Sequence, residues 1–191
     1  MLPSVNKMPD LSNNGNLTGR YLAASMAHEG KNLTDYEKKL LVVYIRLMDK
    51  AISEYQTARE YLTQQIEAIS RKEYGNLSIF GFWNYMESCI ITTRRIFRIF
   101  DKIKSTRGVL KLERVNRKLI EKASREITNI RNDVEHIDEE IRNMKYLVLS
   151  VNSTEDGITT GKKEVKFINL ANVLSRLQET GILWLKEFAK V

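Results

Sequence analysis

The sequence predicts an all-α fold: an antiparallel bundle of long helices with a small β-hairpin inserted before the C-terminal helix. The only prolines are Pro3 and Pro9, so no proline interrupts a helix beyond residue 9. Apolar residues recur every three or four positions over long segments, which is the period of an amphipathic helix. Near residue 146 this period gives way to runs typical of strands. A chain of 191 residues is long enough for one core, and we expect a single domain over residues 34–191.

The first helix of this domain is expected to follow a leader. Residues 1–33 are rich in Asn, Ser and Gly without sustained periodicity, so we expect a flexible leader there, with a short helical piece over Tyr21–Ala27. The sequence Thr-Asp-Tyr-Glu at 34–37 is a capping box, in which the threonine caps a helix and the glutamate reaches back to it. A long amphipathic helix is predicted from about Asp35 to Lys72. Its inward stripe is Leu40, Tyr44, Leu47, Ala51, Tyr55, Ala58, Leu62, Ile66 and Ile69.

The second and third helices are predicted from different patterns. The segment Leu77–Lys104 is the most apolar of the chain, and its apolar residues lie on more than one face. Such a helix is either the buried centre of a bundle or has a second face that meets another copy of the protein. We expect the second arrangement, a homodimer. A loop at 105–108 leads to a third helix, predicted from about Lys111 to Met144. Its stripe repeats in heptads: Ala123, Ile127, Ile130, Val134, Ile137, Ile141 and Met144.

The C-terminal part is predicted to begin with a hairpin. Two β-type runs, 146–151 and 163–168, flank a polar connection that contains Asp156-Gly157 and Gly161, so we expect a β-hairpin over about 146–168. A final amphipathic helix is predicted from Leu170 to Lys190. Its inward residues are Val173, Leu174, Leu177, Ile182, Leu185 and Phe188.

The composition indicates the cellular compartment in which the protein is expected. No apolar run approaches the roughly 18–20 residues of a membrane span, and the N-terminus lacks the apolar segment of a signal peptide. The lone cysteine, Cys89, has no second thiol to bond and no companion ligands for a metal. We therefore expect a cytoplasmic protein that needs no cofactor and does not associate with a membrane.

Positive charge is concentrated in one part of the chain. The formal net charge is +7, and the stretch from Arg94 to Arg131 alone carries +9, because it holds 13 basic and four acidic residues. Such a concentration attracts RNA or another polyanion, although the same residues can simply solvate the outer faces of two helices. The candidate RNA-binding residues are Lys102, Lys104, Arg107, Lys111, Arg114, Arg117, Lys118, Lys122 and Arg125.

One of the two histidines lies in a polar decapeptide, Arg131–Glu140, inside the third predicted helix. At 100° per residue, Asn132 and His136 fall on the face away from the heptad stripe, and Arg131 lies on a flank about 80° from its centre. An imidazole can move a proton near neutral pH, and a guanidinium can stabilise a phosphorane-like transition state. These groups suffice for metal-independent attack of a ribose 2′-hydroxyl on its own phosphate.

Five acidic residues crowd the same segment, at 133, 135 and 138–140. Glu139 shares the outer face with His136, and Glu135 follows Arg131 at the i,i+4 spacing of a helical ion pair. These acids either support a catalytic site by holding Arg131 or make the whole motif a structural ion-pair network. The alternative to catalysis is therefore a non-catalytic helical protein-interaction module.

The pattern Arg-Asn-x-x-x-His in the last long helix of a bundle resembles the motif of the HEPN family (higher eukaryotes and prokaryotes nucleotide-binding). Members of that family carry an Arg, a following polar residue and a His four to six positions after the Arg, and here Arg131, Asn132 and His136 match. The order of motif helix, small hairpin and last helix is also similar to a bacterial HEPN-like subgroup. This resemblance covers about residues 35–190 in architecture, but only the decapeptide in residues.

The resemblance implies a dimeric, metal-independent endoribonuclease in which two motif helices form one cleft. Arg131 would stabilise phosphate charge, Asn132 would orient the scissile phosphate, and His136 would act as general acid and base. HEPN proteins occur in toxin–antitoxin and other defence systems, so an antitoxin or other protein partner is implied, and some members only bind. The residues after His136 are Ile137-Asp138. The control scheme of HEPN toxins that end in His-x-Tyr, in which the antitoxin modifies the tyrosine, is therefore not implied.

Overall fold

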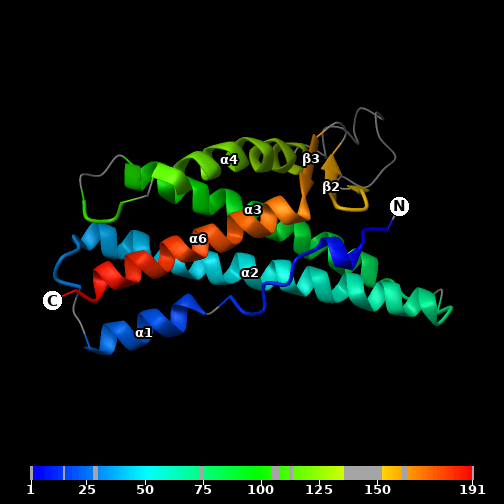
Figure 1. Ribbon diagram of the computed structural model, residues 1–191, viewed down its shortest axis with the longest axis horizontal. Coiled ribbons are helices and arrows are strands. Elements are labelled where there is room, and N and C mark those ends of the chain that lie inside the picture. The colour runs from blue at the N-terminus through cyan, green and yellow to red at the C-terminus, as the bar shows by residue number, and fades with distance from the viewer. Residues whose placement is uncertain are drawn as a thin grey trace.

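The computed structural model describes residues 2–14, 16–27, 30–73, 75–104, 108–111, 114–135, 152–160 and 163–190. It confirms the predicted fold class, a helical bundle with a small antiparallel β-hairpin before the C-terminal helix (Figure 1). The elements in chain order are η1 (Val5–Lys7), α1 (Leu17–Ala27), α2 (Asp35–Ser70), α3 (Ser78–Lys104), α4 (Arg114–Glu135), β1 (Asn152–Ser153), β2 (Gly157–Thr160), β3 (Lys163–Lys166) and α6 (Phe167–Phe188).

Helix α2 begins at the predicted capping box. Thr34 Oγ1 accepts a hydrogen bond from the Glu37 backbone N–H at 3.2 Å, and Glu37 Oε2 accepts one from the Thr34 N–H at 3.0 Å. The inward stripe is buried from Leu40 to Leu62, but Ile66 and Ile69 are 37% and 43% exposed. Both residues lie near the end of α2, which continues together with α3 beyond the start of α6 (Figure 1).

Helix α3 packs against α2 and α4. From Met86 onward its apolar side chains are buried or half-buried within one chain. Its polar contacts to α2 centre on the buried carboxylate of Glu54, which accepts hydrogen bonds from the hydroxyls of Ser88 and Thr92. Only the beginning of the helix keeps large exposed apolar side chains, so the second apolar face predicted for this segment is confined to that end. The predicted homodimer remains a prediction.

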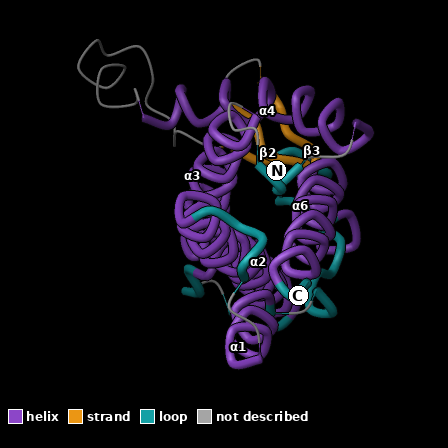
Figure 2. The backbone as a smooth tube through the Cα atoms, turned by 90° about the vertical axis from the view of Figure 1, so that its left-hand side faces the viewer, coloured by secondary structure: helices purple, strands orange, loops and turns teal. Residues whose placement is uncertain are grey.

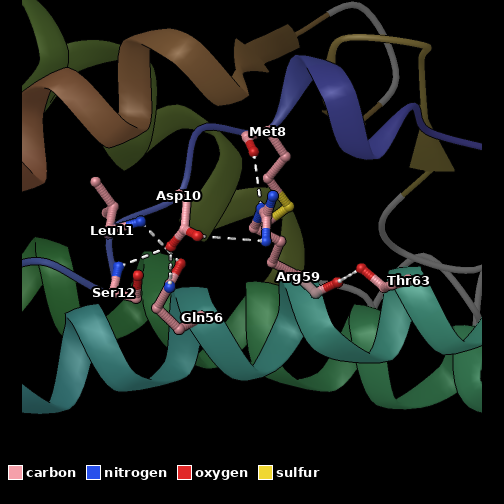
Figure 3. Close-up of polar contacts among 7 residues, drawn as sticks. All are labelled: Met8, Asp10, Leu11, Ser12, Gln56, Arg59 and Thr63. Carbon is pink, nitrogen blue, oxygen red and sulfur yellow. Dashed lines mark hydrogen bonds and ion pairs between the residues drawn. The ribbon is translucent and has the colours of Figure 1, made fainter.

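The structure differs from the predicted leader at the residues that it describes between 2 and 33. Met8, Leu11, Leu17 and Leu33 are buried in the common core. The segment around Asp10 lies along α2, where Gln56 Nε2 donates to Asp10 Oδ1 at 2.6 Å (Figure 3). Close by, Arg59 Nε donates to the Met8 carbonyl oxygen at 3.0 Å. Irregularly spaced apolar residues leave no periodic pattern even when each one packs. The short helical piece predicted over 21–27 belongs to α1.

The hairpin lies within the predicted range of about 146–168, but the bounds of its strands differ from those predicted. Strand β3 pairs antiparallel with β2, in the register Gly157↔Lys166 to Thr160↔Lys163, and β1 pairs with β2 on the other side. Strand β2 thus occupies part of the predicted polar connection. A Cβ at Gly157 would lie 2.6 Å from the carbonyl oxygen of Val165, so this residue is a strand position that needs glycine. The predicted strand at 146–151 lies outside the described residues.

Helix α6 starts at Phe167, so the strand predicted to end at 168 ends at Lys166. Five of the six predicted inward residues are buried, and Ile182 is half-buried. Trp184 packs between the rings of Tyr44 and Phe100, with centroids 4.7 and 5.5 Å away. No helix in the described part of the chain is both long enough and apolar enough to cross a membrane.

Candidate functional site

Helix α4 carries the candidate site, and its inner face follows the predicted stripe. Ala123, Ile127 and Ile130 are buried, as is Ile120 one turn before them. The described helix ends at Glu135, inside the predicted span of 111–144. The later stripe residues, Ile137, Ile141 and Met144, lie outside the described residues, as does the Val134 side chain.

The segment 110–111, which precedes α4, is held by two contacts from other helices. Glu37 Oε1 accepts a hydrogen bond from the Leu110 N–H at 3.1 Å, and the Trp184 indole N–H donates to the Lys111 carbonyl oxygen at 2.9 Å. Burial by itself would raise the pKa of Glu37, but hydrogen bonds from Thr34, Leu110 and Val109 outweigh it and lower that pKa. The carboxylate that caps α2 therefore also fastens the segment leading into α4.

The other end of α4 lies beside the hairpin (Figure 2). Lys163 Nζ donates to the carbonyl oxygen of Asn129 at 3.5 Å, nearly two turns before the end of the described helix at Glu135. Strand β3 is itself anchored to the β1–β2 turn by the ion pair between Lys166 and Asp156, at 2.8 Å. The hairpin thus lies against the half of α4 that carries the motif.

Arg131 and Asn132 are the two motif residues whose side chains the structure describes, and both are half-buried. Arg131 Nη1 donates to Asn132 Oδ1 at 3.1 Å. Because the amide oxygen accepts this bond, the group of Asn132 that can meet a phosphate is its Nδ2 donor. Asn132, which was predicted to lie on the outer face, is half-buried. The pair presents donors of one kind, suited to an anion.

The remaining motif residues fall where the structure describes less. His136 and Glu139 lie outside the described residues, and so does the side chain of Glu135, the last residue of α4. Of the three predicted catalytic residues, the structure therefore describes Arg131 and Asn132. Neither the approach of His136 nor the predicted Arg131–Glu135 ion pair is among the described contacts.

The basic residues predicted to bind RNA divide into two groups. Six have exposed side chains: Lys102 on α3, Lys111 before α4, and Arg117, Lys118, Lys122 and Arg125 on α4. Arg107 lies outside the described residues, as do the side chains of Lys104 and Arg114. Lys118, Lys122 and Arg125, here called the basic row, follow each other at helical spacing along the outer face of α4. Asn129 and Asn132 continue this line toward Arg131, and Glu121 is an exposed acidic neighbour.

A cavity that sequence analysis missed lies at the other end of the bundle, beside the start of α4. Its volume is about 660 Å³. Its lining residues are Asn32, Thr34, Glu37, Gly108, Val109, Lys111, Leu183, Trp184 and Glu187. The capping box in the sequence indicated two of these residues, Thr34 and Glu37. The other sides of the cavity come from segments more than 70 residues further along the chain, which the sequence pattern did not connect with them. Among the described residues, no group of three His, Cys, Asp or Glu side chains is placed to hold a metal ion.

Comparison of the chain with protein-family models, with curated proteins and with solved structures found no match. The HEPN resemblance therefore rests on the motif and on the order of the elements.

Proposed function

We propose that this protein is a HEPN-like, dimeric, metal-independent endoribonuclease or RNA-binding protein of a bacterial or phage defence or toxin–antitoxin system, acting in the cytoplasm. One observation carries the proposal: the exposed basic row runs along α4 toward the hydrogen-bonded pair of Arg131 and Asn132. From Lys118 to Asn132 the line spans about 21 Å at 1.5 Å per residue. Such a row suits several consecutive phosphates of an RNA strand.

The proposed chemistry follows from the groups at the motif end. His136 removes the proton of a ribose 2′-hydroxyl, whose oxygen then bonds to the adjacent phosphorus while the bond to the 5′-oxygen breaks. The leaving 5′-oxygen receives a proton from an imidazolium, and a 2′,3′-cyclic phosphate remains. Arg131 stabilises the extra negative charge on the phosphorus oxygens, and Asn132 Nδ2 orients the phosphate by donating to it.

A second candidate is favoured by the same hydrogen bond. Arg131 uses one of its donors on Asn132 within its own helix, as a structural side chain would. In this second candidate α4 is the recognition helix of a non-catalytic protein-interaction module, and the acidic residues that follow complete an ion-pair network. This module predicts that His136→Ala lowers stability or partner binding, and that there is no nuclease activity to lose.

Cleavage assays separate the two candidates. The full chain, Arg131→Ala and His136→Ala are incubated with labelled RNA in the presence of EDTA, and products are tested for cyclic phosphate ends. The matched control is Arg176→Ala, an exposed arginine on α6 paired with Glu179 at 2.7 Å. We expect cleavage by wild type and the control, and a loss of roughly 100-fold or more in each motif variant. Equal activity in all four proteins, or none in wild type, would remove the catalytic proposal.

A further inference from the structure

The basic residues of α3 are confined to the end of the helix. Residues 94–102 include four basic residues and one acidic residue, Asp101, whereas residues 75–93 include one charged residue, the acidic Glu87. The side chains of Arg95, Arg98 and Lys102 are exposed, and that of Arg94 is half-buried. The arginines of this stretch have no role in the function proposed above.

Two of these arginines lie on the side of α3 that is turned away from α2. Thr92 Oγ1 donates a hydrogen bond to Glu54 of α2 at 2.8 Å, which marks the side facing α2. At 100° per residue, Arg94 and Arg98 point about 160° and 120° away from Thr92. Phe97 points about 140° away from Thr92 and is 2% exposed, so another element covers this side. Since α3 packs against α2 and α4, the helix nearest to the two arginines is α4.

Helix α4 begins at the level of these arginines. The Trp184 ring centroid lies 5.5 Å from that of Phe100 on α3, and the Trp184 indole N–H donates to the Lys111 carbonyl oxygen at 2.9 Å. The chain leading into α4 therefore passes the level of Phe100, and α4 then runs back along α3 in the opposite direction (Figure 1). Arg94 and Arg98 precede Phe100 by about 9 and 3 Å along the helix, so they lie beside the first turns of α4.

The first turns of α4 carry exposed basic residues of their own. With the two arginines of α3 they form what is here called the two-helix surface, which consists of Arg94, Arg98, Arg117, Lys118 and Lys122. Its exposed acidic neighbours are Asp101 and Glu121. Five basic and two acidic residues leave this surface a net charge of +3, which attracts a polyanion.

The charge changes along α4 toward Arg131. The part of α3 that lies further along α4 is residues 75–93, which contain no basic residue. Lys163 of the hairpin lies beside this half of α4, and its Nζ donates to the Asn129 carbonyl oxygen at 3.5 Å. Of the two helices, both are therefore basic at the start of α4, whereas only α4 is basic near the motif.

The two-helix surface offers no aromatic side chain on which a base could stack. The described helix α4 contains no aromatic residue, and Phe97 and Phe100 of α3 are 2% and 1% exposed. Sites for single strands usually combine basic charge with aromatic stacking. Duplex RNA is instead bound mostly through its shape, its phosphates and its 2′-hydroxyls. The composition of this surface therefore favours a duplex over a single strand.

We propose that the two-helix surface binds the double-stranded stem of an RNA, and that a single strand leaving the stem follows α4 to Arg131. The axes of packed helices are about 8–10 Å apart, so cations on both helices can reach the two phosphate backbones of one duplex. Near the motif only α4 contributes, which suits one backbone. The inference rests on the proposed function in taking RNA as the ligand.

Binding is measured by fluorescence anisotropy with two labelled RNAs that carry equal numbers of phosphates: a stem with a single-stranded extension, and an unstructured strand. The single-stranded riboses are 2′-O-methylated, so that the full chain binds without cleaving. The full chain is expected to bind the stem RNA roughly tenfold or more tightly than the strand, because it contacts more phosphates. Equal affinity, or tighter binding of the strand, would overturn the proposal.

Substitutions on α3 separate this surface from a general attraction by positive charge. The double variant Arg94→Gln/Arg98→Ala is expected to reduce the slope of log affinity against log salt by about 2 for the stem RNA, and to leave the slope for the strand unchanged. Arg98→Ala alters an exposed side chain, so it retains the fold, and it should reduce the stem slope by about 1. The control Lys39→Ala/Arg46→Ala removes two exposed cations of α2 and should change neither slope. Equal reductions for both RNAs, or in the control, would contradict the proposal.

The position of the RNA is tested with a cutting probe. The native thiol of Cys89 is fully buried, so Asp101→Cys and Asn129→Cys each add one accessible thiol at an exposed position. These positions are more than about 20 Å apart along α4. An iron chelate attached to the thiol cuts nearby RNA with hydroxyl radicals. We expect cuts in both strands of the stem from position 101 and in the single strand from position 129. The same cuts from both positions would exclude this placement.

The outcomes separate this inference from the proposed function. Loss of cleavage with an intact preference for the stem would defeat the ribonuclease alone. Cleavage of RNA without any preference for the stem would defeat the two-helix surface alone. Failure to bind either RNA at low salt would defeat both.

Discussion

Replacing Glu37 by alanine is expected to lower the free energy of unfolding by about 2–4 kcal/mol, because the carboxylate serves two segments at once. Its side chain is 2% exposed and accepts hydrogen bonds from the Thr34 N–H, the Thr34 hydroxyl and the Leu110 N–H at 3.0, 2.9 and 3.1 Å. Leaving the buried Leu110 N–H without an acceptor costs about 1–3 kcal/mol. Losing half of the capping box costs about another 0.5–1 kcal/mol.

Urea unfolding followed by far-UV circular dichroism measures this loss. The matched control is Glu60→Ala, an exposed glutamate of the same helix, for which a change within about 0.5 kcal/mol is expected. A loss below about 1 kcal/mol for Glu37→Ala, or one equal to the control, would refute the idea that this carboxylate fastens the segment before α4.

The pH dependence provides an independent check on Glu37. The pKa of this carboxyl is lower in the folded chain than the ordinary value of 4.5. Its contribution to stability is therefore complete above pH 4.5 and is lost as the pH falls through the lower folded pKa. Glu37→Gln cannot titrate, so the difference in stability between wild type and this variant is expected to shrink on acidification. A difference that stays constant down to pH 3 would contradict the assignment.

Three further outcomes are expected. Gly157→Ala places a Cβ 2.6 Å from a backbone oxygen of β3 and should lower thermal stability by about 1–3 kcal/mol, measured by calorimetry. Asp49→Ala removes the carboxylate that accepts hydrogen bonds from the first two backbone N–H groups of α1, at 2.9 and 2.8 Å. It should cost about 1 kcal/mol and speed proteolysis of that helix first. Replacing all three residues of the basic row by alanine should reduce the slope of log affinity against log salt for single-stranded RNA by about 2, measured by fluorescence anisotropy. An unchanged slope would exclude this row from RNA binding.

Local patterns predicted the parts of the fold that depend on neighbours in sequence. The capping box at 34–37 and the stripe of α4 from Ala123 to Ile130 are defined within a few residues, and both are observed. The second role of Glu37 could not be predicted, because its partner Leu110 is 73 residues away. Strand β2 was missed for a related reason, since its glycine and threonines resemble a loop until β3 pairs with them.

The candidate site shows the same division between local and distant causes. The helical period predicted that Arg131 lies on a flank of α4, and its side chain is half-buried there. The elements that hold this flank in place could not be identified from spacing alone. Near this flank the contact comes from the hairpin through Lys163, whereas α2 through Glu37 and α6 through Trp184 contact the segment before the other end of α4.

Helix α4 carries its buried apolar residues and its exposed basic residues on different faces. Its inner face packs four apolar side chains into the core, and neighbouring elements contact the segment before it and its Asn129 carbonyl oxygen. Groups that bind a transition state must keep their positions to within about 0.5 Å, which a rigidly packed helix achieves better than a loop does. Substitutions on the basic row should therefore alter ligand affinity at constant stability, whereas substitutions at Glu37 or Ile127 should alter both.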